Sequence, residues 1–193
     1  MRIIAGKANR RQLDTLPGED ITRPTSDRAK EGLFSAIQFH LQGKRVLDLF
    51  AGCGALGLEA VSRGAESAVL IDSSTDAFEI IKKNARNTGL IKQCRISRMD
   101  YSEFLKSAAT KNEQFDIIFL DPPYAKDMKN EIVKKVSRSG IIADNALVIC
   151  ETDNDCFEGN GAYELDFIKT YKYGKTFITI LKKTNEEAGE DNE

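Results

Sequence analysis

The sequence predicts an α/β protein built on a doubly wound, mostly parallel sheet. The first indication is that short apolar runs alternate with stretches whose apolar residues recur every three or four positions, the pattern of strands alternating with helices. The second is a glycine-rich loop after the first of these runs. The third is an acidic residue at or just after the end of four of the runs. A chain of 193 residues can form one such domain with a substantial core.

The expected elements follow one another along the chain. A basic hairpin is expected over residues 2–15, and a helix from about residue 25, whose inner face carries Ala29, Leu33, Ile37 and Leu41. Strands are expected at 45–50, 67–72, 93–98, 115–120 and 146–151, and helices at 54–63, 76–88, 101–108 and 127–138. The last two strands, near 163–170 and 175–182, have no helix between them, so an antiparallel hairpin is predicted.

The motif Asp121-Pro122-Pro123-Tyr124 directly follows the apolar run 115–120. Two consecutive prolines have no backbone N–H and a fixed φ, so the loop that leaves this strand is stiff. A carboxylate and a carbonyl then lie together as hydrogen-bond acceptors beside an aromatic ring, which suits a planar base with an exocyclic amine. The motif resembles the catalytic loop of amino-methyltransferases that use S-adenosylmethionine (SAM). A proline-rich turn after a buried strand is the simpler alternative.

The glycine-rich loop places Gly52, Gly54 and Gly57 at a G-x-G-x-x-G spacing between a strand and a helix. This spacing fits a nicotinamide dinucleotide or SAM equally well, and Asp72 follows where ribose hydroxyls are bound. Asp48, just before the loop, favours SAM, because a carboxylate there repels a pyrophosphate and attracts the α-amino group of SAM. The alternative is that Asp48 only caps the loop backbone.

Four acidic residues, Asp48, Asp72, Asp100 and Asp121, lie at or just after the ends of expected parallel strands. Ligands of doubly wound sheets bind at the carboxyl ends of the strands, so we expect these four side chains on one edge of the sheet. Asp100 is expected to contact the adenine amine of the cofactor. It could equally be the N-cap of the helix expected at 101–108.

Composition excludes several other classes of protein. No run of about twenty apolar residues is present, so no membrane span is expected. Four cysteines without a C-x-x-C pair, together with a single histidine, argue against a zinc site and favour reduced thiols in the cytoplasm. No metal cofactor is expected.

Basic charge is concentrated near the N-terminus, where Arg2, Lys7, Arg10 and Arg11 occur within twelve residues that contain no acid. This pattern fits an arm that binds a polyanion, although a solvated hairpin would look the same. Arg23 and Arg28 could bind phosphate or pair with nearby acids. The final ten residues carry five acids and no base, and they are expected to be disordered.

Taken together, the motifs resemble the RsmD family of bacterial 16S rRNA (guanine-N2)-methyltransferases. The segments that carry the resemblance are Arg2–Gly6, Thr22–Arg28, Val46–Gly52, Gly54–Ala60 and Phe119–Tyr124. The resemblance implies a seven-stranded, Rossmann-like SAM-dependent methyltransferase fold. It also implies that the partner is 16S rRNA within small-subunit assembly intermediates, and we expect the protein to act as a monomer.

The resemblance also implies residue roles and domain limits. The catalytic residues would be Asp121, Pro122, Pro123 and Tyr124, and the cofactor-binding residues Asp48, Phe50, Gly52, Gly54, Asp72 and Asp100. The RNA-binding residues would be Arg2, Lys7, Arg10, Arg11, Arg23 and Arg28. Residues 1–24 would form an RNA-binding extension, residues 25–183 the methyltransferase domain, and residues 184–193 an acidic tail. Three other functions fit less well: an adenine-N6 methyltransferase, a nicotinamide oxidoreductase and a non-catalytic RNA-binding assembly factor.

Overall fold

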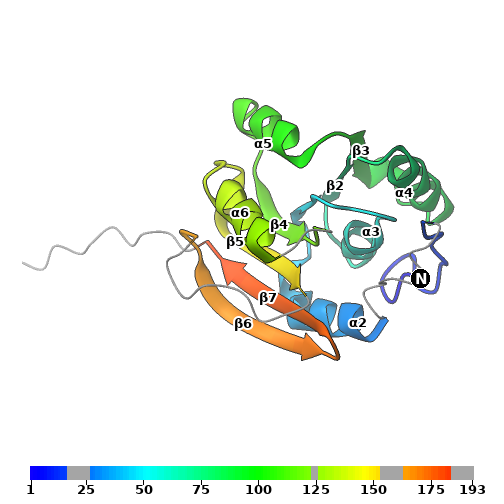
Figure 1. The fold of residues 1–193 in the computed structure, drawn as a ribbon. Coiled ribbons are helices and arrows are strands. Elements are labelled where there is room, and N and C mark those ends of the chain that lie inside the picture. Colours follow the sequence, from blue (N-terminus) through cyan, green and yellow to red (C-terminus); the bar gives the residue numbers. More distant parts are fainter. Residues whose placement is uncertain (17–26, 123–125, 153–162, 184–193) are drawn as a thin grey trace, which may run out of the picture.

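The computed structural model describes residues 1–16, 27–122, 126–152 and 163–183, and its elements are labelled in Figure 1. The helices are α2 (Asp27–Ala36), α3 (Ala55–Ser62), α4 (Thr75–Asn87), α5 (Tyr101–Thr110) and α6 (Lys126–Ser137), with short 3-10 helices at Gln38–His40 and Ile91–Gln93. The strands are β1 (Arg45–Asp48), β2 (Ser67–Asp72), β3 (Cys94–Arg98), β4 (Phe115–Leu120), β5 (Ile142–Thr152), β6 (Asp166–Tyr173) and β7 (Thr176–Lys182).

The seven strands form one sheet in the order β3-β2-β1-β4-β5-β7-β6. Neighbouring strands from β3 to β5 are parallel, whereas β7 pairs antiparallel with both β5 and β6. The doubly wound sheet and the final antiparallel hairpin are therefore confirmed. Strand β5 begins four residues earlier than expected, at Ile142. The polar pair Asp144-Asn145 therefore lies inside β5. The strand is irregular at this point, because its pairing with β4 shifts register and Asn145 has a φ of 59°.

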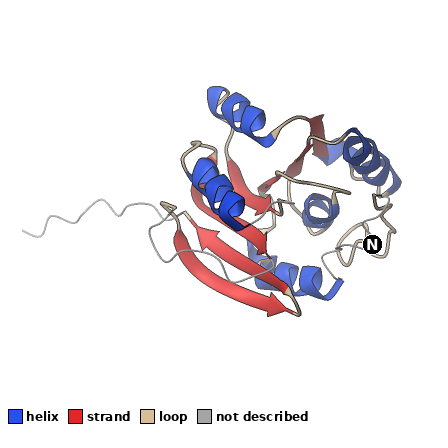
Figure 2. Ribbon diagram, in the orientation of Figure 1, coloured by secondary structure: helices blue, strands red, loops and turns tan. Residues whose placement is uncertain are grey.

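Helices cover both faces of the sheet (Figure 2). One core lies between the sheet and α2, α3 and α4, and the other lies between the sheet and α5 and α6. Strands that are buried on both faces read as continuous apolar runs, which is why 67–72 and 115–120 were recognisable in the sequence. The expected stripe on α2 is also buried, and His40 lies exposed just beyond it.

Residues 1–16, called the N-terminal segment below, do not confirm the expected β-hairpin. Its two arms meet at an isolated antiparallel bridge between Arg2 and Gln12, where the N–H of Ile3 donates to the Arg11 carbonyl at 2.9 Å and the N–H of Leu13 to the Met1 carbonyl at 2.9 Å. The N–H groups of Ile4 and Ala5 donate instead to the carboxylate of Glu59 on α3, at 2.7 and 3.0 Å. The segment therefore has one bridge between its arms rather than a regular ladder, and the residues that lead into its turn bond to α3. It lies beside α4 in Figure 1.

A buried charge cluster holds the N-terminal segment against α2 and α3. Glu59 is fully buried and lies 3.5 Å from the ammonium group of Lys30 and 2.7 Å from Nε of Arg63. Burial lowers the pKa of Lys30, an effect that the nearby Glu59 carboxylate opposes. Gly6 passes so close to the carbonyl of Ser62 that a methyl group there would overlap it. The segment is therefore part of the domain surface rather than a free arm.

Candidate active site at the carboxyl edge of the sheet

The strand register places the four predicted acids on one edge of the sheet. Asp48 pairs with Leu70 of β2 and with Phe119 of β4, and Asp72 pairs with Arg98 of β3. Asp100 and Asp121 follow the last residues of β3 and β4. The parallel strands therefore bring all four residues to their shared carboxyl edge, as the sequence predicted.

The glycine loop, residues 49–54, connects β1 to α3 at this edge. Gly52 and Gly54 have φ values of 54° and 82°, which side chains with a Cβ adopt only with strain. Gly57 is needed for a different reason, because a methyl group there would lie 2.9 Å from the side chain of Leu70 and 3.3 Å from Oδ2 of Asp48. Two of the glycines thus shape the turn, and the third lets α3 approach the sheet.

Asp48 is buried beneath the glycine loop, with 2% of its surface exposed. Its Oδ2 accepts the N–H of Gly57 at 2.9 Å, so the capping alternative is realised. Burial raises the pKa of Asp48 to about 7; the Gly57 bond opposes this, and the negative charge of Asp72 reinforces it. A cation bound beside Asp48 would favour its ionised form.

Asp72 closes the other side of the glycine loop. Its Oδ2 accepts the N–H of Gly52 and its Oδ1 accepts the N–H of Ser74, each at 2.9 Å. Two more loop N–H groups donate internally, from Ala51 to Ile71 and from Gly54 to Ala51. These four N–H groups are therefore committed within the protein rather than directed at a ligand.

Asp100 is the N-cap of α5. Its Oδ1 accepts both the N–H and the hydroxyl of Ser102, at 2.8 and 2.6 Å. The bond from the Ser102 hydroxyl is the main cause of the lowered pKa of Asp100. The next residue, Tyr101, packs its ring on Phe50 of the glycine loop, with centroids 5.4 Å apart. An aromatic surface therefore lies between the ends of β1 and β3.

The loop after β4 begins with a partly buried Asp121 and a buried Pro122. Pro122 borders a small cavity with Ile132 and Val133 of α6, so it fixes the path of the chain as it leaves the sheet. The predicted catalytic residues Pro123 and Tyr124 lie outside the described residues.

The predicted RNA-binding residues are spread over the N-terminal segment and α2. Arg2 pairs with Asp27, with Nε and Oδ2 3.0 Å apart, and Lys7 bonds to Gln93. Arg10 and Arg11 are exposed, and neither has a carboxylate partner among the described residues. Arg28 is exposed on α2, while Arg23 falls outside the described residues.

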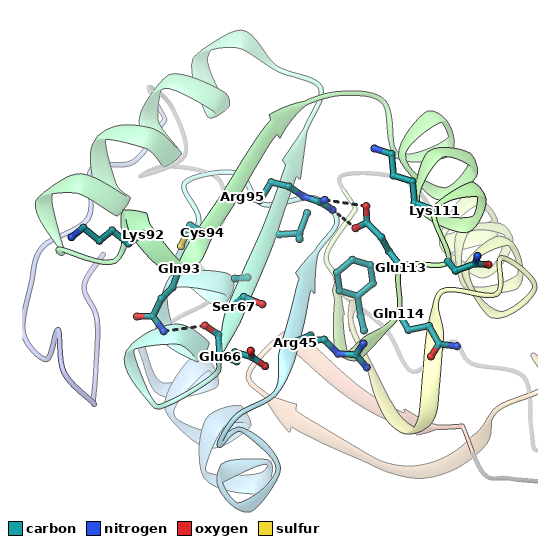
Figure 3. Close-up of a pocket in the computed structure, with 14 residues that line it drawn as sticks. Arg45, Glu66, Ser67, Lys92, Gln93, Cys94, Arg95, Lys111, Glu113 and Gln114 are labelled. Carbon is teal, nitrogen blue, oxygen red and sulfur yellow. Dashed lines mark hydrogen bonds and ion pairs between the residues drawn. The ribbon is translucent and has the colours of Figure 1, made fainter.

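A second cavity, of about 600 Å³, opens at the opposite, amino-terminal end of the parallel strands (Figure 3). The two arginines that line it already pair with acids, Arg45 with Asp116 and Arg95 with Glu113. It lies a full strand length away from Asp121, so we do not assign it to the reaction. Among the described residues, no group of three or more His, Cys, Asp or Glu could hold a metal, and no helix is long and apolar enough to cross a membrane.

Sequence reasoning missed three residues near the site. Tyr101 supplies the ring against Phe50, and its position directly after Asp100 was the available signal. Asn84 is fully buried on α4, and a polar residue within an apolar helical stripe could have indicated a structural role. Glu151 follows Cys150, the partner of Leu120 in β4, and so lies on the same edge as Asp121. The expected strand 146–151 contained it, but nothing in its local sequence singled it out.

The strand order, the final antiparallel pair and the acids on the carboxyl edge define the class of fold. The solved structure of the Thermus thermophilus 16S rRNA N2 G1207 methyltransferase, in complex with AdoMet and guanosine, matches with a TM-score of 0.66 at 22% identity, covering 84% of this chain and 45% of that one. The putative methyltransferase yhhF from Escherichia coli matches with a TM-score of 0.82 at 29% identity, and the match covers 95% of this chain and 98% of that one. The fold is that of the SAM-dependent methyltransferases.

The sequence comparisons place the chain within a family. Residues 1–182 match the family described as Conserved hypothetical protein 95. The ribosomal RNA small subunit methyltransferase D of Escherichia coli strain K12 is 35% identical over 153 residues, which cover 79% of this chain and 75% of that protein. The chain belongs to this family, the RsmD family.

Proposed function

We propose that this protein transfers a methyl group from SAM to the exocyclic N2 amine of a guanine in 16S rRNA during small-subunit assembly. The observation that carries this proposal is the position of Asp121 and Pro122 at the carboxyl end of β4, next to the end of β1 and the glycine loop. A pair of acceptors that suits an amine would therefore adjoin the loop that we assign to the cofactor. The name of the Escherichia coli relative supports small-subunit rRNA as the substrate.

The residues of the edge fit SAM better than a nicotinamide dinucleotide. A pyrophosphate needs loop N–H groups that point outwards, but those of Gly52 and Gly57 donate to Asp72 and Asp48. The two carboxylates also make this end of the loop negative, which suits the α-amino group and sulfonium of SAM. The Phe50 and Tyr101 rings offer an apolar surface for its adenine.

When bound, SAM supplies a methyl group on a positively charged sulfur. The guanine N2 lone pair is delocalised into the ring, so the protein has to hold the amine in line with the methyl group. We assign the carboxylate of Asp121 and the carbonyl of Pro122 as acceptors for the two amine hydrogens. During methyl transfer, positive charge would develop on the amine, where Asp121 would stabilise it until the amine loses a proton to water. Tyr124 would stack on the extruded base.

Residues 1–24 would provide the first contact with rRNA, through Arg10, Arg11 and neighbouring basic residues. Arg10 and Arg11 are exposed and have no carboxylate partner among the described residues, which supports this role, because phosphate contacts need accessible cations. Residues 25–183 would carry out the methyl transfer. The enzyme would then select a folded assembly particle, because only such a particle contacts both the RNA-binding residues 1–24 and the site of methyl transfer.

Single-turnover methylation of small ribosomal particles with saturating SAM tests the proposed role of Asp121. The Asp121→Ala variant should lose at least about a hundredfold in rate, because it removes charge stabilisation from the transition state. Its affinity for S-adenosylhomocysteine (SAH), measured by calorimetry, should stay within about twofold of wild type. Asp144→Ala, which removes an exposed acid on β5, is the matched control and should be unaffected. A near wild-type rate in Asp121→Ala, or binding of NADH in place of SAH, would contradict the proposal.

A further inference from the structure

We propose that the tip of the β6–β7 hairpin, together with Arg28 of α2, binds the RNA strand that flanks the target nucleotide. This inference rests on the proposed function and adds a second RNA-binding surface to it, separate from the N-terminal segment. The surface, called the hairpin surface below, comprises Arg28, Lys169, Tyr171, Lys172, Tyr173, Lys175 and Phe177.

The strand register places the tip of the hairpin, residues 171–177, on the same edge of the sheet as Asp121. Leu120, at the end of β4, pairs with Cys150 of β5, which pairs with Thr179 of β7, which pairs with Thr170 of β6. Residues 171–177 lie beyond this row, at the carboxyl edge. Strands are about 4.8 Å apart, so Tyr171 is roughly 14 Å from Asp121 along the row. A short stretch of single-stranded RNA spans that distance.

The tip is basic and its charges are not neutralised. Residues 168–177 contain Lys169, Lys172 and Lys175 and no acid. All three lysines are exposed, and within the described part of the chain none of them pairs with a carboxylate. The arginines of the cavity at the other end of the sheet, by contrast, are held by Asp116 and Glu113. Unpaired cations are the ones that a phosphate backbone can use.

Aromatic rings lie beside these lysines on both faces of the hairpin. The rings of Tyr171 and Tyr173 are nearly parallel, at an angle of 15° with centroids 6.4 Å apart, and both are partly exposed. Nζ of Lys169 lies 5.0 Å from the centre of the Tyr171 ring, and Nζ of Lys172 lies 5.1 Å from that of Phe177. Because side chains alternate along a strand, Lys169, Tyr171 and Tyr173 share the face that packs on α2, and Lys172 and Phe177 share the opposite face. Each face of this edge strand therefore carries a ring beside a cation, a combination that suits single-stranded RNA, because bases stack on rings while lysines contact phosphates.

Helix α2 fixes the hairpin tip in place and extends the surface. The Tyr173 hydroxyl packs so closely on Gly32 that a methyl group at Gly32 would overlap it. Arg28 lies four residues before Gly32, one helical turn away on the same face, and is exposed. Figure 1 shows the end of β6 and the start of β7 beside α2. Arg28 therefore adds a positive charge on the side of the hairpin that packs on α2, where Lys169 also lies.

Lysines on an edge strand can also serve only to prevent pairing with other chains, and β6 is an edge strand. That role requires charge anywhere along the edge. It predicts neither protection of these particular lysines by RNA nor a dependence of RNA affinity on them. The two roles can therefore be separated by experiment.

The test compares the double variant Lys172→Gln/Lys175→Gln with wild type in binding to small ribosomal particles across a salt series. Each lost phosphate contact should flatten the log–log salt slope by about 0.7–0.9, so the variant should be shallower by one to two units and bind about tenfold more weakly at moderate salt. The matched control is Lys106→Gln/Lys111→Gln, which removes the same charge from exposed lysines in and just after α5. Lysine acetylation of the wild-type complex, read by mass spectrometry, should show protection of Lys172 and Lys175 but not of Lys106.

Hairpin and control variants with equal salt slopes, or unprotected lysines at positions 172 and 175 in the complex, would overturn the inference. In either case, wild-type methylation of the particles would leave the proposed function standing. If wild type neither binds nor methylates the particles, the proposed function fails first and the hairpin surface fails with it.

Discussion

The side-chain amide of Asn84 joins Asp14 of the N-terminal segment to Cys53 of the glycine loop. Its Nδ2 donates to the carbonyl oxygens of Asp14 and Cys53, at 2.9 and 2.8 Å, and its Oδ1 accepts the N–H of Asp14 at 2.9 Å. Asn84 is fully buried, and these bonds use both of its donors and its acceptor. One side chain therefore ties the proposed RNA-binding segment to the proposed cofactor loop.

Replacing Asn84 with leucine should weaken SAH binding by about tenfold. The substitution leaves buried carbonyl groups at Asp14 and Cys53 without a donor, which costs roughly 1–3 kcal/mol and frees the glycine loop to move. Isothermal titration calorimetry of a variant shown to be folded by circular dichroism measures the effect. Gln93→Leu is the control, because Gln93 anchors Lys7 and the carbonyl of Ala65 away from the loop. Equal SAH affinity in Asn84→Leu and Gln93→Leu would show that Asn84 does not support the loop.

SAH affinity should depend on pH through Asp48. The free protein holds the Asp48 proton with a pKa raised by burial to about 7, and the α-amino cation favours the ionised carboxylate. Affinity should therefore be constant above pH 7 and fall about tenfold per unit below it. Calorimetry from pH 5.5 to 8.5 tests this, and a flat profile for wild type would remove Asp48 from the cofactor site.

Asp48→Asn is the control for that profile and has an effect of its own on stability. The folded protein binds the Asp48 proton more tightly than the unfolded chain, whose pKa stays near 3.8, so wild-type stability should fall as pH rises from about 4 to 7. Asparagine keeps an acceptor for Gly57 without the buried charge. The variant should bind SAH weakly at every pH, yet melt about 2–6 °C higher than wild type at pH 8 without ligand.

Removing the charge of Glu59 should destabilise the fold. Glu59→Gln leaves the buried Lys30 without a counter-ion and weakens the anchors of Ile4 and Ala5, so we expect a loss of about 3–5 kcal/mol in the free energy of unfolding. Urea denaturation measures it. Glu79→Gln, which breaks the exposed pair with Lys82, should cause little change. Similar stabilities for the two variants would show that the buried cluster is not what holds the N-terminal segment.

Tyr124 should act through its ring rather than its hydroxyl. Tyr124→Ala should be strongly impaired in single-turnover methylation, by roughly tenfold or more, because base stacking is worth about 1–3 kcal/mol. Tyr124→Phe should lose no more than about threefold, since its ring still stacks. If phenylalanine were as damaging as alanine, the hydroxyl would have to be given a role in the reaction.

The N-terminal segment should contribute to RNA affinity and not to cofactor affinity. Arg10→Ala/Arg11→Ala should flatten the log–log salt slope for particle binding by about one to two units. SAH affinity should not change, because both side chains are exposed and Asn84 reaches the loop through Asp14. The Lys106→Gln/Lys111→Gln variant again controls for loss of charge. A slope equal to that of wild type would mean that this part of the segment is only a solvated surface.

The elements and their order could be predicted from the sequence because strands buried on both faces and amphipathic helices leave strong local patterns. The edge that carries Asp48, Asp72, Asp100 and Asp121 was predictable as well, since parallel strands must align their carboxyl ends. Sequence could not decide whether Asp48 and Asp100 cap the backbone, because that depends on where the N–H groups of Gly57 and Ser102 point.

The structure of the N-terminal segment could be predicted only in part from its local sequence. A glycine between basic residues suggested a hairpin, and the two arms do meet at the Arg2–Gln12 bridge. The donors of Ile4 and Ala5, however, are taken by Glu59, more than fifty residues away. Asn84 likewise acts across separations of 70 and 31 residues. Pairings over such distances are fixed by tertiary packing, which local patterns do not record.

The most direct test of the central claim is transfer of labelled methyl from SAM to bacterial small ribosomal particles, followed by digestion and identification of the labelled nucleoside. The proposed function predicts that the label appears in N2-methylguanosine of 16S rRNA, with wild type but not with Asp121→Ala. Label in N6-methyladenosine, or no transfer to the RNA of particles that the protein binds, would contradict it.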